Sequence, residues 1–326
     1  MLSLVIKKET WSLKGSFTIS RLTMYESYVL VVEISDGIQV GRGECEPHES
    51  DPSCMNVVES IIEDLRSKIE NGITRSELNA LLPAGPARNA IDCALWDLEA
   101  KQSGKRAWEL AEVDLNSPLV TAYTICLESA EQMAAKALKH KHRKLLKLKL
   151  GAENSIQLVK AVRQQAPDTC LIVDANEAWT FEQLNELAPP LAELGVALIE
   201  QPMPAGKDQE LEHYTGPVPL CADESCLDRK SLQDVNKRYE FINIKLDKTG
   251  GLTEALLLAD EAKRIGLRLM VGCMTGTSLA MAPAMIIGAM AEFCDLDGPL
   301  LLEKDRIPGL VYEDSLVCLP EVAMWG

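Results

Sequence analysis

The feature that most constrains the fold is a series of eight short β-rich runs in the middle of the chain. Helical patterns such as NSIQLVKAVRQQA and LTEALLLADEAKRIG lie between runs. A polar residue stands at or near the end of each run, and these residues follow one another at intervals of 22 to 28 positions. That interval fits one strand, one helix and two short loops. The eight residues are Thr124, Lys149, Asp174, Glu200, Asp223, Lys245, Cys273 and Asp295.

Repeated βα units predict a parallel sheet, which is either closed as a barrel or open and doubly wound. A barrel explains the polar residues better, because the carboxyl ends of all its strands meet at one mouth where active sites are built. An open sheet gives no reason for polar groups at all eight strand ends. We therefore expect an α/β fold with a (β/α)8-type, TIM-like barrel over residues 119–300.

The N-terminal residues 1–118 predict a separate α+β capping domain. Two β-rich stretches flank the sequence SDG at 35–37, which favours a hairpin turn. Amphipathic helices are expected over 56–72, ended by Asn-Gly, and over 87–104, ended by Gly. The C-terminal segment 301–326 has short β-like runs and is expected to return to the capping domain.

Three carboxylates, those of Asp174, Glu200 and Asp223, stand at the ends of consecutive predicted strands. Neighbouring strands are about 4.8 Å apart, so these side chains can converge. Crowded carboxylates raise one another's pKa unless a positive charge joins them. All-oxygen ligands favour Mg²⁺ over zinc, and we expect one Mg²⁺ per subunit. The alternative, that each is an ordinary capping or surface carboxylate, explains one of them more easily than three at matched positions.

Two lysines flank this trio, Lys149 one strand before it and Lys245 one strand after it. Lys147 faces the same way as Lys149, because side chains alternate along a strand. Inward ammonium groups close together lower one another's pKa towards the range of a general base. The alternative is that these lysines only balance the acidic trio.

These residues form motifs that resemble those of the enolase superfamily, within its muconate-lactonising subgroup. The motifs are K-x-K at 147–149, D-x-N at 174–176, E-Q-P at 200–202, D-E-S at 223–225 and K-L-D-K-T-G-G at 245–251. Enolase-superfamily sites use a Lys or His base with Mg²⁺. The resemblance implies that one lysine removes the proton next to a substrate carboxylate, and that the other returns a proton to the opposite face. Lys147 and the metal would stabilise the enediolate formed between these steps.

The sequence D-L-D at 295–297 bears on the substrate. Asp295 and Asp297 place two carboxylates on one face of the mouth, which suits an ammonium group. The resemblance implies that such a pair binds the free amino group of a dipeptide, so we expect epimerisation of L-Ala-D/L-Glu in the recycling of murein peptides. A capping Asp and a turn Asp are the alternative explanation of this pair.

Other functions stay open at this point. The same subgroup includes N-acyl amino acid racemases and o-succinylbenzoate synthases, whose substrates lack the amine. A catalytically silent barrel that only binds a ligand is a third possibility, although retention of the three carboxylates and two lysines argues against it.

The resemblance also implies several substrate contacts. Arg21 lies in the segment 18–27, which is expected to be a loop that closes over the mouth, and a guanidinium is suited to bind the glutamate side chain. A solvated surface arginine is the alternative. Thr124, Cys273 and Thr275 fall where the family contacts the substrate backbone.

Composition limits the partners and the compartment. With 49 acidic and 33 basic residues the net charge is −16, which disfavours nucleic acid and anionic membranes. Ten scattered cysteines form no C-x-x-C pair, the N-terminus lacks a signal-peptide pattern, and no apolar run reaches 18 residues. A cytoplasmic enzyme with a small dipeptide substrate is expected, and its oligomeric state stays open.

Overall fold

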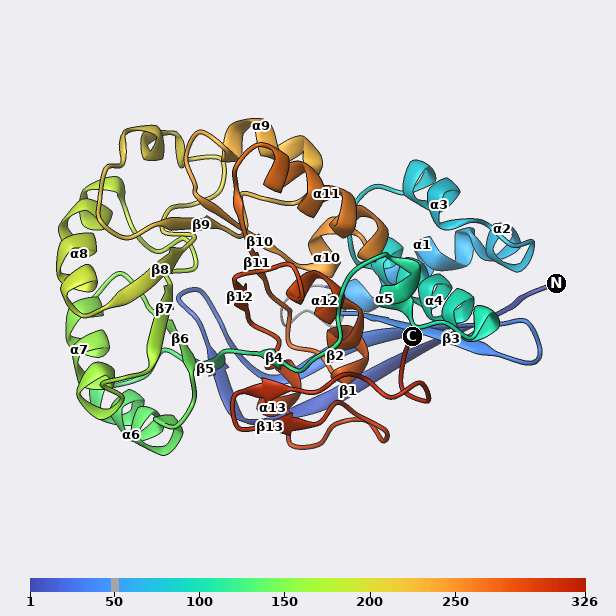
Figure 1. Cartoon of the computed structure of the whole chain (residues 1–326), viewed down its shortest axis with the longest axis horizontal. Helices are drawn as coiled ribbons and strands as arrows, with labels where there is room; N and C mark the ends of the chain where they lie inside the picture. The colour runs from blue at the N-terminus through green and yellow to red at the C-terminus, as the bar shows by residue number, and fades with distance from the viewer. Residues whose placement is uncertain (48–52) are drawn as a thin grey trace.

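A computed structural model describes residues 1–47 and 53–326 and contains an eight-stranded parallel sheet that curls on itself (Figure 1). Each predicted β-rich run contributes one strand. The sheet order follows the sequence order, and its two edges meet where the Ala122 N–H donates to the Cys294 carbonyl at 2.8 Å. The predicted barrel-type architecture is therefore confirmed. The strands are β5 (Tyr123–Ile125), β6 (Leu145–Lys149), β7 (Cys170–Asp174), β8 (Val196–Glu200), β9 (Leu220–Ala222), β10 (Phe241–Ile244), β11 (Arg268–Val271) and β12 (Phe293–Cys294).

Helices cover the outside of this sheet. They include α6 (Ala130–His140), α7 (Ser155–Gln165), α8 (Phe181–Glu193), α11 (Leu252–Arg264) and α12 (Ser278–Gly288). Two short helices, α10 (Leu246–Thr249) and α13 (Gly298–Leu301), lie instead at the mouth, after β10 and β12. The connection from β8 to β9 instead contains the 3-10 helix η1 (Gln209–His213), and that from β9 to β10 contains η2 (Arg229–Ser231) and α9 (Leu232–Val235). The expected helix between β8 and β9 is thus reduced to a single short turn, because Pro202, Pro204, Pro217 and Pro219 interrupt that connection.

Side chains inside the barrel form layers. Alternation along β6 sends Leu145, Lys147 and Lys149 to the inner face, while Leu146 and Leu148 join the core beneath the helices. The lowest inner layer is apolar and takes one residue from each of seven successive strands or their starts. It consists of Ala122, Leu145, Ile172, Leu198, Cys221, Phe241 and Met270.

The N-terminal part is an antiparallel sheet covered by helices. Its strands are β1 (Ser3–Thr18), β2 (Thr23–Ser35) and β3 (Val40–Cys45), and Ser35 pairs with Val40 across the predicted hairpin turn. The sheet packs against helix α4 (Pro86–Ser103), whose expected glycine cap, Gly104, has φ +69°. A Cβ on Gly43 would lie 2.1 Å from the Ala90 carbonyl oxygen, so only glycine permits this close packing.

Shorter helices complete this part of the molecule. The helix expected over 56–72 divides at Leu65 into α1 (Cys54–Asp64) and α2 (Arg66–Glu70). They are followed by α3 (Arg75–Leu81), and α5 (Ala107–Leu110) follows α4. No helix within residues 1–47 and 53–326 is both long enough and apolar enough to cross a membrane.

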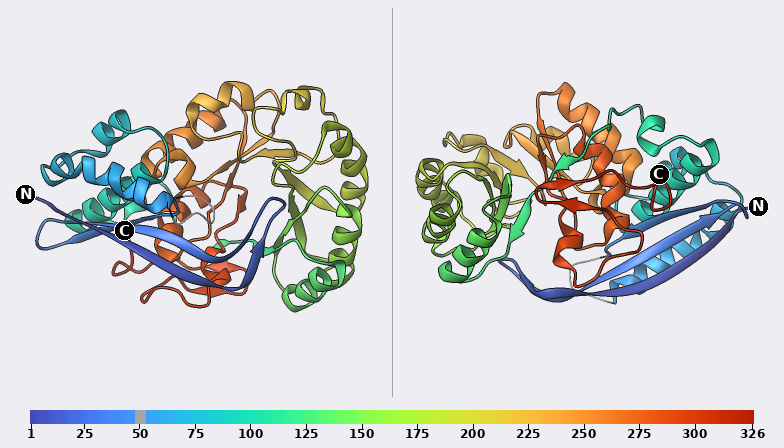
Figure 2. Two further views of the ribbon diagram at one scale, coloured as in Figure 1. Left: turned by 180° about the vertical axis from the view of Figure 1, so that it is seen from behind. Right: turned by 60° about the horizontal axis from the view of Figure 1, so that its bottom comes forward.

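The β1–β2 hairpin extends from the N-terminal sheet towards the strands of the barrel, as the blue ribbon in Figure 2 shows. The ten-residue loop expected over 18–27 is wrong in extent, because β1 and β2, after an irregularity between Ser12 and Phe17, are paired again up to Thr18 and Thr23. Only the tip between them turns, closed by the Ile19 N–H donating to the Leu22 carbonyl at 3.0 Å. The Ser20 hydroxyl donates to the Asn176 carbonyl at 2.8 Å and so holds the tip beside the end of β7.

The C-terminal segment contacts both parts of the molecule. Strands β13 (Tyr312–Glu313) and β14 (Leu316–Val317) form a small sheet with β4 (Leu119–Val120). The Trp325 indole donates to the Arg42 carbonyl at 3.0 Å, and the Gly326 N–H donates to Asp97 Oδ1 at 2.7 Å. The division into residues 1–118, 119–300 and 301–326 stays a prediction.

Candidate active site

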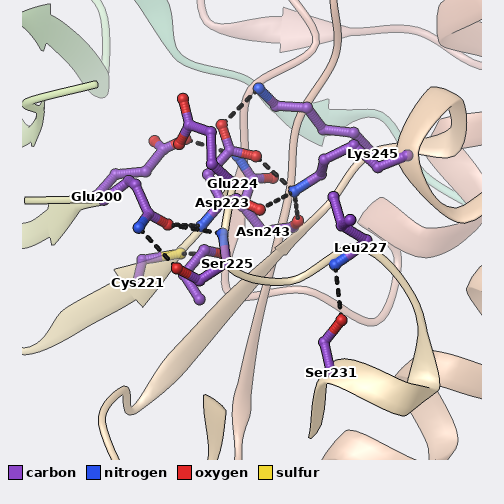
Figure 3. A network of polar contacts seen from close by, with 12 residues as sticks. Glu200, Cys221, Asp223, Glu224, Ser225, Leu227, Ser231, Asn243 and Lys245 are labelled. Atoms are coloured by element: carbon purple, nitrogen blue, oxygen red, sulfur yellow. Dashed lines mark hydrogen bonds and ion pairs between the residues drawn. The ribbon is translucent and has the colours of Figure 1, made fainter. Parts of the chain in front are cut away.

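Three carboxylates meet at the carboxyl ends of adjacent strands. Asp174 ends β7 and is in register with Glu200 at the end of β8, and Asp223 directly follows β9. All three are at most 2% exposed. Figure 3 shows Glu200 and Asp223 close to Asn243 and Lys245 from the end of β10. The structure therefore brings the predicted acidic trio together.

The predicted lysines lie between these carboxylates. Lys147 Nζ lies 2.7 Å from Glu200 Oε2 and 3.2 Å from Asp174 Oδ2. Lys149 donates to Asp174 Oδ2 at 2.6 Å, and Lys245 donates to Asp223 Oδ2 at 2.7 Å. In the sheet, β7, β8 and β9 lie between β6, which carries Lys149, and β10, which leads to Lys245. The two lysines thus approach one cavity from different sides.

The charges around the lysines determine their pKa values. Burial lowers the pKa of Lys147, but the carboxylates of Asp295 and Glu200 outweigh burial and raise this pKa well above its usual range. Burial also opposes the positive charge of Lys245, and Asp223 again outweighs it, so its pKa is raised. The expectation that a neighbouring ammonium group lowers the pKa is wrong for Lys147, because the carboxylates around it outweigh that effect.

The carboxylates of Asp174 and Glu200 have different pKa values. Burial disfavours ionised Asp174, yet Lys149 and Lys147 lower its pKa to about 2. Burial and the charge of Asp174 raise the pKa of Glu200 to about 7. Burial is the larger cause of the raised pKa of Glu200, and a positive charge bound at the trio would favour its ionised form.

The donor set fits a hard cation such as Mg²⁺. It offers carboxylate oxygens from three buried side chains, and Glu200 Oε2 contacts Lys147 without hydrogen-bond geometry. Within the residues that the structure describes, no three acidic, His or Cys side chains are arranged as a ready metal cluster, since lysines occupy the space between the carboxylates. Asp174, Glu200 and Asp223 are the residues that could hold the ion.

Asp295 and Asp297 line the same cavity from the end of β12. Lys147 donates to Asp295 Oδ2 at 2.8 Å, and the Thr124 N–H donates to Asp297 Oδ2 at 2.6 Å. Among the described residues, Asp295 Oδ1 is buried without a hydrogen-bond partner. Burial and the charge of Asp295 raise the pKa of Asp297 to about 7. This side of the cavity has acceptors suited to a cationic group.

The remaining predicted site residues are divided between the cavity and its rim. Thr124, Cys273 and Thr275 line the cavity, and burial raises the pKa of the Cys273 thiol well above its usual range, so this thiol is neutral. Arg21, at the hairpin tip, points instead to Glu224 Oε1 at 3.0 Å and Glu177 Oε2 at 3.4 Å.

Sequence reasoning missed several residues at this site. Glu224 and Asn176 line the cavity, and they lie within the motifs D-E-S and D-x-N. Asn243 donates to Glu200 Oε1 at 2.8 Å, and Lys248 donates to Asp223 Oδ1 at 2.5 Å. The signal for Lys248 was its position three residues after Lys245, which places both on one short turn.

Family comparisons agree with this architecture. Residues 128–321 match the family described as enolase C-terminal domain-like, and residues 1–111 match the mandelate racemase/muconate lactonizing enzyme N-terminal domain. The chain belongs to the mandelate racemase/muconate lactonizing enzyme family of the enolase superfamily. The resemblance inferred from the strand-end motifs is confirmed.

Two curated relatives are similar to the chain over most of their length. It is 44% identical to L-Ala-D/L-Glu epimerase of Escherichia coli K12, over 96% of this chain and 98% of the relative. It is 46% identical to N-acetyl-D-glutamate racemase of a Pseudoalteromonas species, over 77% of this chain and 79% of the relative.

Two solved structures are also similar to the chain. An enolase family member from Agrobacterium tumefaciens, with homology to dipeptide epimerases and with bound sodium and L-Ala-L-Glu, has 48% identity and a TM-score of 0.97, with complete coverage of both chains. A dipeptide epimerase from Enterococcus faecalis V583, complexed with Mg and L-Leu-L-Tyr, has 28% identity and a TM-score of 0.89, covering 98% of this chain and 97% of the other.

Proposed function

We propose that the protein is a Mg²⁺-dependent dipeptide epimerase that acts on L-Ala-D/L-Glu and inverts the α-carbon of the second residue. The observation that carries this proposal is the buried pair Asp295 and Asp297 in the same cavity as Lys149 and Lys245. The carboxylate pair suits the free ammonium group of a dipeptide, and the lysines suit proton transfer at its α-carbon. The curated epimerase relative and the L-Ala-L-Glu complex support the same substrate.

Proton transfer is assigned to Lys149 and Lys245. Lys245 must leave Asp223, which raises its pKa, before it can act as a neutral amine. The lysine that is neutral takes the α-proton, and the electron pair of the broken C–H bond passes into the substrate carboxylate to give an enediolate. The other, as an ammonium group, donates a proton to the opposite face, and the electron pair returns to form the new C–H bond. Their approach from different sides of the cavity supports inversion.

Charge stabilisation is assigned to the acidic trio and to Lys147. Asp174, Glu200 and Asp223 would hold Mg²⁺, which when bound supplies positive charge for the carboxylate of the substrate. Lys147 is buried beside Glu200 and keeps its ammonium charged, so it can stabilise the same developing negative charge.

Substrate binding is assigned to the rest of the cavity. Asp295 and Asp297 would accept hydrogen bonds from the ammonium group, and Thr124, Cys273 and Thr275 would contact the dipeptide backbone. Arg21 would bind the side-chain carboxylate of the substrate glutamate. To do so it must leave its present partners, Glu224 and Glu177.

The setting proposed for this activity is recycling of murein peptides in the cytoplasm. All ten cysteines are free thiols in the structure, which supports a reducing compartment.

The proposed organisation is a capping domain of residues 1–118, a barrel of residues 119–300 and a returning segment of residues 301–326.

The decisive experiment is incubation of L-Ala-L-Glu with the protein and Mg²⁺ in D₂O. We expect deuterium at the glutamate α-carbon together with L-Ala-D-Glu, both measured by mass spectrometry and NMR. Absence of deuterium at that carbon would disprove the proposal.

Racemisation of N-acetylglutamate is the second candidate, favoured by the similarity to N-acetyl-D-glutamate racemase. That substrate has no ammonium group for Asp295 and Asp297 to bind. Comparing kcat/KM for N-acetyl-L-glutamate and L-Ala-L-Glu separates the two functions, and we expect the dipeptide to be preferred.

A further inference from the structure

Lys248 is a fourth lysine at the acidic trio, and its contacts differ from those of the other three. Its Nζ donates to Asp223 Oδ1 at 2.5 Å, to the Asp223 carbonyl at 2.5 Å and to the Asn243 carbonyl at 2.9 Å. An ammonium group has three N–H donors, so all of them are used. Two acceptors are backbone carbonyls, which cannot turn away as a side chain can. Lys248 is therefore held in place rather than available for proton transfer.

These contacts lie where the pairing of strands β9 and β10 ends. The two strands are in register only at Cys221 with Phe241 and at Ala222 with Ile242. Asp223 and Asn243 follow these pairs, and Lys248 joins their carbonyls across the gap. The Lys248 side chain thus replaces further backbone pairing between β9 and β10 at the position of Asp223.

Asn243 extends the effect of Lys248 to a second carboxylate. The Asn243 amide donates to Glu200 Oε1 at 2.8 Å, and Asn243 is fully buried. Asn243 belongs to β10, the strand that leads to Lys245, and Figure 3 shows it close to Asp223. Through the Asn243 backbone, Lys248 links the positions of Asp223 and Glu200.

The turn that carries Lys248 is fixed from the N-terminal part of the molecule. Arg88 of α4 donates to the Thr249 carbonyl at 2.5 Å and to the Gly250 carbonyl at 3.0 Å. A Cβ on Gly251, where φ is +110°, would lie 2.5 Å from Asp92 of the same helix. Close packing of α4 against this turn holds the backbone from which Lys248 reaches Asp223.

We propose that Lys248 is a positioning residue, which fixes the Asp223 carboxylate for binding of the divalent cation. This inference rests on the cation site of the proposed function. Lys245 contacts the other oxygen, Asp223 Oδ2, at 2.7 Å and lines the cavity, so it is placed to turn to a substrate. Lys248 would keep the Asp223 carboxylate oriented while the Lys245 side chain turns to the substrate.

The test is Mg²⁺ binding by isothermal titration calorimetry on the full-length protein without substrate. Loss of a residue that orients a metal ligand weakens metal binding by about 10- to 100-fold, which is the increase in Kd expected for Lys248→Met. Lys248→Arg, which keeps charge and donors, should recover part of this loss. Lys237→Met is the matched control, because Lys237 lies on the surface with its side chain 53% exposed, and its Kd should equal that of the wild type.

A merely structural role makes a different prediction. It would lower the Tm of Lys248→Met without changing the Mg²⁺ Kd measured well below that Tm, and this result would overturn the proposal. If Lys248→Met does not fold, Lys248→Gln, which retains neutral donors, is judged by the same criterion.

Kinetics add a second readout. If L-Ala-L-Glu is turned over, the variant should need more Mg²⁺ for half-maximal activity, and saturating Mg²⁺ should restore most of kcat. If neither wild type nor variant acts on this dipeptide while their Mg²⁺ affinities differ as expected, the role of Lys248 stands and the proposed substrate is wrong.

Discussion

On strand β8, Leu198 and Glu200 are two residues apart and both are buried inside the barrel, yet they lie in different surroundings. Leu198 belongs to an apolar layer that includes Ile172 and Phe241 from other strands. Glu200 lies in a layer of carboxylates and lysines at the mouth. The lower layer lowers the free energy of the fold by burying apolar surface, whereas the upper layer contains buried charges that contribute little net stability. The comparison indicates that changes in the two layers affect different measurable properties.

The largest expected effect is on activity, from changes in the upper layer. Lys149→Met and Lys245→Met should each slow epimerisation by about 10²- to 10⁴-fold, because each removes one of the two proposed proton-transfer groups. Each variant should still exchange the α-proton of one epimer of the dipeptide, and the two variants should act on opposite epimers. NMR in D₂O, started from L-Ala-L-Glu and separately from L-Ala-D-Glu, measures this.

Lys160→Met on the exposed face of α7 is the control for these variants and should retain wild-type activity. Normal epimerisation in both directions by either Lys149→Met or Lys245→Met would rule out the two-lysine scheme.

In the lower layer, Leu198→Ala should affect stability instead. Leu198 is fully buried, so truncation to alanine leaves a cavity and should cost about 2–5 kcal/mol of unfolding free energy. Leu198→Met, which nearly conserves volume, should cost less than about 1.5 kcal/mol. Chemical denaturation measures both variants. The folded alanine variant should keep kcat within a few-fold of the wild type, and a loss of kcat as large as that of the lysine variants would show that the two layers are not separable.

Within the upper layer, Asp297→Ala should separate substrate binding from proton transfer. Loss of one partner of a buried charged contact costs about 2–5 kcal/mol, so kcat/KM for L-Ala-L-Glu should fall by about 10²-fold or more. Any activity on N-acetyl-L-glutamate, which has no ammonium group, should change much less. Asp297→Asn is the control, because its amide oxygen can still accept from the Thr124 N–H. Equal losses on both substrates would assign Asp297 to structure rather than to recognition of the amine.

Sequence reasoning could locate the upper layer because its residues end short apolar strands. The runs that precede Asp174 and Glu200 are apolar enough to be recognised without knowledge of the fold, and parallel strands bring their ends together. The five motifs also allowed the superfamily to be recognised. The prolines between β8 and β9 indicate that a full helix cannot form there. The regular spacing of the strand-end residues nevertheless predicted a helix in that connection, as in the others.

The electrostatics of the site could not be predicted in the same way. Besides burial, the pKa of Lys147 depends on four carboxylates at the ends of other strands, including Asp295, which is 148 residues away along the chain. A sequence pattern shows that charged groups converge, but it does not show which of them is closest. For the same reason, the partners of Arg21 emerged only from the fold, since Glu177 and Glu224 lie on connections after β7 and β9.

Arg21→Met should have the smallest effect and tests the rim of the upper layer. The Arg21 side chain is 35% exposed, so loss of its ion pairs to Glu224 and Glu177 should change stability by less than about 1 kcal/mol. If Arg21 binds the glutamate side chain, KM for L-Ala-L-Glu should rise about tenfold while KM for L-Ala-L-Met stays constant, because only the first substrate carries the second carboxylate. A parallel rise for both dipeptides would instead mean that Arg21 acts by holding the hairpin tip against Glu224. Steady-state kinetics with the two dipeptides therefore decide whether the rim recognises the substrate or only closes the cavity.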